Sequence, residues 1–175
     1  MARDSSFSPQ PLLLGLLMSE PKHGYELHQE FERSLGTIWQ MGLSQLYAQL
    51  KLLEEAGLVA SHAEPQPGRP PRKVYQLAPE GRDLFLAWVH EPTPYLRRIR
   101  TEFLARLYFF VQLSLPGLDR LVAEQKAVCE EQVARFDRLI DQADDGFRQV
   151  VLEFRRGQLL AVMSWLDRCV EILSP

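Results

Sequence analysis

The most regular hydrophobic pattern in the chain lies in Leu43–Gly57, where leucines recur at spacings of three and four residues. Such spacing places them on one side of a helix that turns about 100° per residue. These apolar positions are Leu43, Leu46, Leu50 and Leu53. The opposite side carries Ser44, Gln45, Ala48, Lys51 and Glu55. Gly57 follows the last apolar turn, where helices commonly end in a left-handed conformation, so the pattern predicts a short helix with an apolar back and a mostly uncharged polar front.

Two extended segments follow this helix. Leu58–Glu64 and Lys73–Leu77 are predicted as strands, and Pro65–Arg72 between them is too rich in proline and glycine to form a helix. A helix followed by a hairpin with a basic tip is the winged-helix arrangement. In that arrangement the helix can enter a major groove of DNA, while the tip reaches the neighbouring backbone or minor groove.

Shorter helices are predicted on both sides of this unit. A serine and a proline precede the buried run Leu12–Met18 and suit a helix start. His23–Leu35 is predicted as a second helix, which Gly36 closes. After the wing, Pro79–Val89 is predicted as a further helix, because proline is tolerated in a first turn and the segment has an apolar face.

From Tyr95 onward the pattern changes to long helices. The predicted helices are Arg97–Ser114, Leu118–Ala143 and Phe147–Leu173. The segment Glu91-Pro92-Thr93-Pro94 interrupts helix formation before them, which predicts a boundary between a domain of residues 1–91 and a domain of residues 92–175. The predicted fold is mainly α with a small β-hairpin wing, and it combines an N-terminal winged helix-turn-helix domain with a long-helix C-terminal dimerisation domain.

The last two helices predict a partner. Each has about 26 residues and would span roughly 40 Å at about 1.5 Å per residue, which exceeds what a compact unit needs for its own core. The excess apolar surface predicts a second copy of the chain in a two-fold dimer. The alternative is a self-contained helical hairpin that folds back on the winged helix.

Several motifs resemble the PadR family of transcriptional regulators. They are HGYEL at His23–Leu27, LYAQLKLLEEAGLV at Leu46–Val59 and GRPPRKVYQL at Gly68–Leu77, followed by Pro79, Glu80 and Gly81. The resemblance covers about half of the chain, and the motifs occur in the family's order. It implies a winged helix-turn-helix that binds DNA and, more loosely, a helical C-terminal region that dimerises. Ala48 stands where the family often has proline and Ala78 where it often has threonine, and both changes are mild.

The predicted DNA contacts lie on the polar front of the helix and at the wing tip. They are Ser44, Gln45, Tyr47, Ala48, Gln49 and Lys51 on the helix, and Arg69, Arg72 and Lys73 on the wing. Glutamine can pair with adenine and lysine can reach guanine, while cations hold the phosphate backbone. The resemblance implies that the Tyr47 hydroxyl meets a phosphate, and the alternative is a ring packed in the core. The expected partner is double-stranded DNA with an inverted-repeat operator.

The overall charge argues mildly against DNA binding, but its distribution does not. The chain has 175 residues, 46% of them hydrophobic, and a formal net charge of −3. The three wing cations fall within a stretch that contains no acid, and local charge makes a phosphate contact. The alternative function is a protein–protein interaction module that kept the winged helix without binding DNA, which the mildly acidic N-terminal domain favours.

The sequence lacks the motifs of catalysis and cofactor binding. It has no G-x-S-x-G, Walker loop or H-E-x-x-H, so we expect no enzyme, cofactor or metal site. One interpretation of His23 is a metal ligand or a catalytic base. The simpler interpretation is a polar residue at a helix start.

Cys129 and Cys169 are predicted as buried thiols in a reducing cytoplasm, with a redox switch between them as the alternative. Because no signal peptide or bilayer-spanning run is found, we expect a soluble cytoplasmic protein.

The resemblance also implies a repressor that a small aromatic or lipophilic effector releases from DNA. The candidates to line a pocket for it are Trp88, Tyr95, Phe109 and Trp165. Aromatic residues at helical spacing form core more often than a ligand pocket, so both interpretations stay open. Two interpretations also remain for Trp39, in the core or beside the DNA, and for the basic cluster Arg97–Arg100, a second DNA contact or a solvated helix start.

Overall fold

The structure of the protein is a computed structural model that describes residues 8–66 and 68–173, without the side chains of residues 66, 69 and 70. It confirms the predicted fold class, because helices predominate and the described strands form a small antiparallel sheet. The chain divides into two compact units. One contains the chain up to His90 together with Leu104–Ser114, and the other contains Glu91–Phe103 and the chain from Leu115 onward. The domain boundary between residues 91 and 92 stays a proposal.

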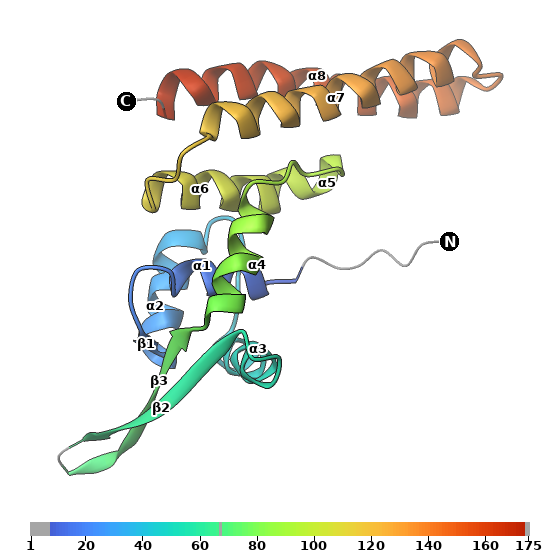
Figure 1. Cartoon of the computed structure of the whole chain (residues 1–175). Coiled ribbons are helices and arrows are strands. Elements are labelled where there is room, and N and C mark those ends of the chain that lie inside the picture. Colours follow the sequence, from blue (N-terminus) through green and yellow to red (C-terminus); the bar gives the residue numbers. More distant parts are fainter. Residues whose placement is uncertain (1–7, 67, 174–175) are drawn as a thin grey trace. The chain divides into compact units, whose positions relative to one another are not determined.

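The helices of the first unit enclose an apolar core (Figure 1). They are α1 (Gln10–Leu16), α2 (Gly24–Leu35), α3 (Leu43–Glu55), α4 (Pro79–Val89) and α6 (Leu104–Gln112). The helix that contains the apolar run Leu12–Met18 begins at Gln10, directly after the serine and proline predicted as its start, and it ends two residues before Met18. Pro79–Val89 has the predicted ends. The fully buried side chains of this core include Leu13, Leu27, Phe31, Leu46, Leu50 and Phe85.

The centre of this core explains the glycine inside α1. A Cβ atom on Gly15 would lie 2.5 Å from the Phe109 ring and 2.6 Å from the Phe85 ring. These two rings meet edge to face, with their centroids 5.1 Å apart. Gly15 therefore lets α1 approach α4 and α6 closely, although glycine lowers the helix propensity of α1.

The sheet joins the wing to the start of α2. Its strands are β1 (Lys22–His23), β2 (Val59–Gln66) and β3 (Arg69–Leu77), in the order β1-β3-β2. β2 and β3 form the predicted hairpin, and they continue into the proline-rich tip that the sequence predicts as a loop. The sequence predicts a helix start at His23 and not a strand, because a two-residue strand has no alternation of polar and apolar positions.

Two glycines predicted to end helices do so in different ways. Gly57 has φ +73°, the predicted left-handed conformation after α3. Gly36 follows α2 with φ −60°, and its N–H bonds to the carbonyl of Glu32 at 3.1 Å. The left-handed helix end is therefore confirmed at Gly57, whereas Gly36 closes α2 in a right-handed conformation.

The second unit is built mainly from α7 (Leu118–Asp141) and α8 (Gly146–Leu173), two long helices that lie side by side (Figure 1). Asp145 caps α8, because its carboxylate accepts the backbone N–H groups of Phe147 and Arg148 at 3.0 Å each. The segment predicted as one helix over Arg97–Ser114 is helical in the structure from Leu96 to Gln112, but it is not a single regular α-helix. The structure has α5 (Leu96–Arg98), a π-helical turn over Ile99–Phe103 and then α6, and residue periodicity does not reveal such a change of hydrogen-bond register.

The linker before α5 is held by α7. Gln125 is fully buried; its side-chain oxygen accepts the Thr93 N–H at 2.6 Å, and its amide nitrogen donates to the Thr93 carbonyl at 3.0 Å. Gln132 donates to the Pro94 carbonyl at 2.8 Å. Buried backbone groups need hydrogen-bond partners, so these amides fix the path of the linker.

Within residues 8–66 and 68–173, no helix is long and apolar enough to span a bilayer.

Candidate nucleic-acid interface

The polar front of α3 faces solvent as predicted. Leu46, Leu50 and Leu53 are completely buried and anchor the back of the helix. The predicted contact residues Ser44, Gln45, Tyr47, Ala48 and Lys51 are exposed, and Gln49 is half-buried. Leu43 is a correction, because its side chain is 37% exposed and does not join the buried leucines. It is the first residue of α3 and lies beyond the core, where it lines an open surface depression with Tyr25 and Arg33 of α2.

Tyr47 combines features of both interpretations that the sequence left open. The residue is 42% exposed, so its ring is not enclosed by the core. The same ring lies against the first residue of α2, because a Cβ atom on Gly24 would be 2.4 Å from it and 2.8 Å from the hydroxyl oxygen. Gly24 therefore makes room for Tyr47 and was missed as a site residue. The contact between the Tyr47 hydroxyl and a phosphate stays a prediction.

Lys73 is tied to α3 by an ion pair. Its ammonium lies 2.6 Å from Glu54 of α3 and 5.2 Å from the centre of the Tyr75 ring. Ser61 of β2 donates to the other Glu54 oxygen at 2.5 Å. The hydrogen bonds from Lys73 and Ser61 lower the pKa of the Glu54 carboxyl, and the same contact with Glu54 raises the pKa of Lys73. The sequence did not predict this link between α3 and the wing.

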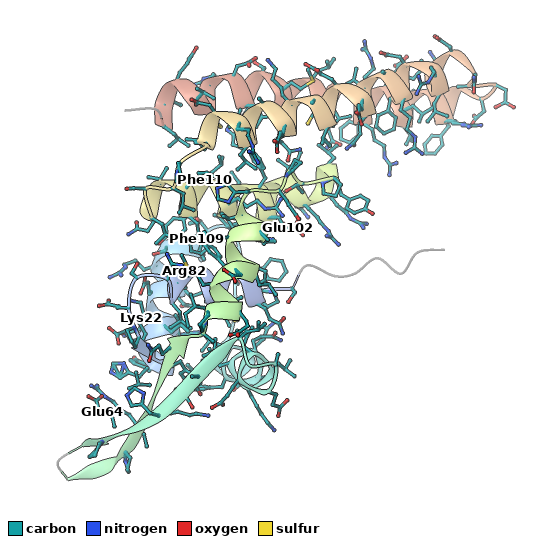
Figure 2. All side chains as sticks on the ribbon, viewed as in Figure 1. Lys22, Glu64, Arg82, Glu102, Phe109 and Phe110 are labelled. Carbon is teal, nitrogen blue, oxygen red and sulfur yellow. The ribbon has the colours of Figure 1, made fainter. Side chains whose placement is uncertain are left out.

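Arg72 is held from two sides. Its Nε donates to the carboxylate of Glu64 at 2.6 Å, and its Nη1 contacts Nε2 of His23. Glu64 is the antiparallel partner of Arg72 in the register of β2 and β3, and Figure 2 labels it on the hairpin. The hydrogen bond from Arg72 lowers the pKa of the Glu64 carboxyl. The side chain of Arg69, the third predicted wing cation, lies outside the described part of the structure.

Both described wing cations therefore have carboxylate partners that sequence reasoning missed. A partial signal was available for Glu64, because pairing the two predicted strands about Gly68 brings it close to Arg72. No such signal was available for Glu54, since its partner lies on a different element. Lys51 has only a loose pair with Glu55 at 3.7 Å, and both side chains are strongly exposed, so this pair leaves Lys51 accessible.

The predicted effector residues fall into the two units. In the first unit, Trp88 packs beside Phe109, with ring centroids 6.4 Å apart. Phe109, which is labelled in Figure 2, is buried. In the second unit, Tyr95 is exposed beneath the guanidinium groups of Arg97 and Arg98, and Trp165 contacts the Phe103 ring. The assignment of these four aromatic residues to an effector pocket stays a prediction.

The remaining candidates have ordinary structural surroundings. His23 lies in β1, where its Nδ1 is 2.6 Å from Glu26 of α2. Trp39 is half-buried. Both cysteines are buried free thiols, and burial raises the pKa of each, which lowers the thiolate fraction near neutral pH.

Comparison with known proteins gives two family matches. The family model of the PadR-like transcriptional regulators matches residues 13–86, and that of the virulence activator alpha C-terminal region matches residues 99–174. Together they cover both the winged helix with its neighbouring helices and the long helices α7 and α8.

Two named regulators and one solved structure are similar to this chain. The negative transcriptional regulator PadR of Bacillus subtilis (strain 168) is 30% identical over 115 residues, which are 65% of this chain and 62% of that protein. The probable transcriptional regulator Rv1176c of Mycobacterium tuberculosis is 34% identical over 84 residues, 48% of this chain and 44% of that protein. The chain thus spans less than two thirds of either regulator. The crystal structure of Bacillus subtilis PadR in complex with operator DNA has 22% identity and a TM-score of 0.48, and the match covers 93% of this chain and 96% of that one.

Proposed function

This chain belongs, through residues 13–86, to the PadR-like family of transcriptional regulators, and from that premise we propose that it is a homodimeric repressor that binds a specific DNA sequence and is released by a small molecule. This family membership agrees with the resemblance of the motifs HGYEL and GRPPRKVYQL to the PadR family. The proposed function has four parts, which are the DNA partner, the dimer, the sign of regulation and the effector.

The observation that carries DNA binding is the exposed polar front of α3. Ser44, Gln45 and Lys51 face solvent on a helix whose opposite side is anchored in the core, so the helix can present them without rearrangement. A single helix fits a major groove roughly 12 Å wide, where glutamine and lysine can reach base edges. Arg72 and Lys73 on the hairpin supply cations for the backbone beside that groove, which fixes the register of the helix.

The proposed dimer rests on an apolar stripe along α8. Phe147, Val150, Val151 and Phe154 share one face of the helix by their spacing, and all four are exposed. Phe147 is 77% exposed and Phe154 is 65% exposed. Exposed apolar stripes of this kind mark interaction surfaces, and a second copy of the chain would cover the same stripe on both partners. Two winged helices in a dimer would bind two half-sites about one helical turn apart, or a multiple of it.

Repression and release by an effector complete the proposed function. Repression is supported by the similarity to a negative transcriptional regulator. For the effector, an aromatic or lipophilic molecule is the proposed ligand. Such a molecule can weaken DNA binding only as far as it prefers one dimer conformation over the other.

One observation favours an interaction module without DNA binding. Arg72 and Lys73 are each paired with a glutamate, so the wing offers less free positive charge than the sequence suggests. Neutralising both cations separates the two functions. A DNA-binding protein should lose affinity for all sequences alike and show a weaker salt dependence, whereas an interaction module should keep its partner.

The proposed function is tested by fluorescence anisotropy of the purified protein on DNA from upstream of its own gene. Random DNA of equal length is the control, and salt is varied from about 50 to 200 mM. We expect tight, salt-dependent binding that prefers the upstream DNA, and the same assay then screens effectors by release. Equal, weak binding to both DNAs would contradict an operator at this position and would direct the search to protein partners.

A further inference from the structure

The start of α2 and the wing meet in a chain of four polar side chains. Glu26 of α2 contacts Nδ1 of His23 at 2.6 Å, and Nε2 of His23 contacts Nη1 of Arg72. The Nε of Arg72 then donates to Glu64 of β2 at 2.6 Å. The contacts thus run from α2 through β1 and β3 to β2, and they connect the helix-turn-helix with a cation of the wing.

The sheet register places these groups on one face. His23 of β1 and His62 of β2 are both antiparallel partners of Val74, one on each side of β3. Arg72 is two residues from Val74, so its side chain lies on the same face, as does its own register partner Glu64. His23 on β1 reaches Arg72 diagonally on the neighbouring strand β3. The contact therefore follows from the register of β1, the strand that the sequence did not predict.

The contact with Arg72 determines the protonation of the His23 ring. Arginine has only donors, so Nε2 of His23 must accept and cannot carry a proton. The single proton of the neutral ring is then on Nδ1, where it is donated to Glu26. The two neighbours thus specify one tautomer, and a second proton on the ring would place an N–H group and a like charge against the guanidinium.

We propose that His23 is a positioning residue for Arg72, which it holds in the orientation that meets a phosphate. The proposal rests on the DNA binding proposed above. Arginine has five N–H donors, and His23 and Glu64 engage two of them, which leaves donors for a phosphate oxygen. A long side chain that is already ordered loses less conformational entropy when DNA binds.

The test compares two amide substitutions that each replace one nitrogen of the ring. His23→Gln places an amide near the position of Nε2 and keeps an acceptor for Arg72, whereas His23→Asn places its amide near Nδ1 and lacks that acceptor. His23→Asn is expected to weaken DNA binding by about two- to tenfold, and His23→Gln is expected to keep the affinity of the wild type. In an Arg72→Ala background the two substitutions should behave alike, because they act through the same guanidinium.

The outcomes separate this inference from the proposed function. Equal losses in His23→Asn and His23→Gln would overturn the role of His23 while DNA binding stands. A wild-type protein that bound no DNA would overturn the proposed function and the role of His23 with it. The tautomer is checked separately in the free protein by ¹⁵N NMR, where a proton on Nε2 instead of Nδ1 would contradict the contact with Arg72.

Discussion

The ammonium of Lys73 lies 2.6 Å from a carboxylate oxygen of Glu54, so a cation of the wing is bound to the helix that presents the polar front. The pair connects two elements that the proposed function requires to act on the same DNA. It also means that Lys73 must leave or share its carboxylate to contact a phosphate. Glu54 is therefore expected to stabilise the wing and to weaken the attraction of the wing for DNA.

Glu54→Gln should tighten DNA binding. The substitution removes the charge that competes with phosphate for Lys73, and an exposed ion pair of this kind contributes about 0.2–1 kcal/mol, which corresponds to a gain in affinity of up to about fivefold. Anisotropy titrations at several salt concentrations measure the effect. Glu55→Gln is the control, because it removes the same charge from the next residue and breaks only a loose pair with Lys51. Equal gains in the two variants would show that only the net charge of the protein matters and that the contact with Lys73 does not.

The same pair gives stability a defined dependence on pH. The pKa of Glu54 is lowered below its ordinary value of 4.5 and that of Lys73 is raised above 10.5 by their contact. The contribution of the pair is therefore complete between these values. It is lost as the pH falls through the lowered pKa of Glu54, and again as the pH rises through the raised pKa of Lys73.

Urea unfolding of the wild type and of Glu54→Gln across this range measures the contribution. The difference in the free energy of unfolding should stay below about 1 kcal/mol, because both side chains are partly exposed, and it should vanish at acid pH. A difference that persisted well below the pKa of Glu54 would assign the stability to the hydrogen bond from Ser61 instead.

The elements that sequence reasoning predicted are those with a strong local signal. The leucine spacing identified α3, and the proline at position 79 and the long apolar repeats identified α4, α7 and α8. What was missed depends on contacts between distant segments. Strand β1 exists only because it pairs with β3, and the glutamate partners of Arg72 and Lys73 come from other elements. The π-helical turn over Ile99–Phe103 is a change of backbone register that leaves the apolar pattern almost unaltered.

Gly24→Ala should disturb the position of Tyr47. A Cβ atom at this position would lie 2.4 Å from the Tyr47 ring, so the ring or the start of α2 must move. Overpacking of this kind typically costs about 1–3 kcal/mol of stability, and a displaced Tyr47 should also weaken DNA binding. Thermal unfolding and anisotropy measure the two effects.

The control for this steric argument comes from the same helix-turn-helix. Gly42→Ala adds the same atom at the N-cap of α3, where nothing lies within 4 Å of it. Because alanine is a poorer N-cap than glycine, we expect a loss of up to about 1 kcal/mol of stability, without a displacement of Tyr47. In a Tyr47→Ala background, Gly24→Ala should become nearly harmless, because the ring that it displaces is absent. Additive losses in the double variant would show that Gly24 is required for some other reason.

Phe154→Ser should weaken self-association of the protein. Phe154 and Phe147 are the two most exposed aromatic side chains of the α8 stripe, and a large ring in the centre of an interface is a typical source of binding energy. Replacing one ring affects both copies in a two-fold dimer, since the same face is used twice. Sedimentation velocity over a range of concentrations should therefore show a lower fraction of dimer in Phe154→Ser than in the wild type.

Gln158→Ser is the matched control, because this exposed residue lies one turn further along α8 and has no apolar side chain to lose. It should sediment as the wild type does. At a protein concentration where both variants are monomeric, they should unfold at the same temperature if Phe154 contributes only to association. The DNA affinity of Phe154→Ser should fall as well, since a monomer engages one half-site where a dimer engages two. If Phe154→Ser lowered DNA affinity without changing the sedimentation, the stripe would contact something other than a second copy, and the interface between the two chains would have to lie elsewhere.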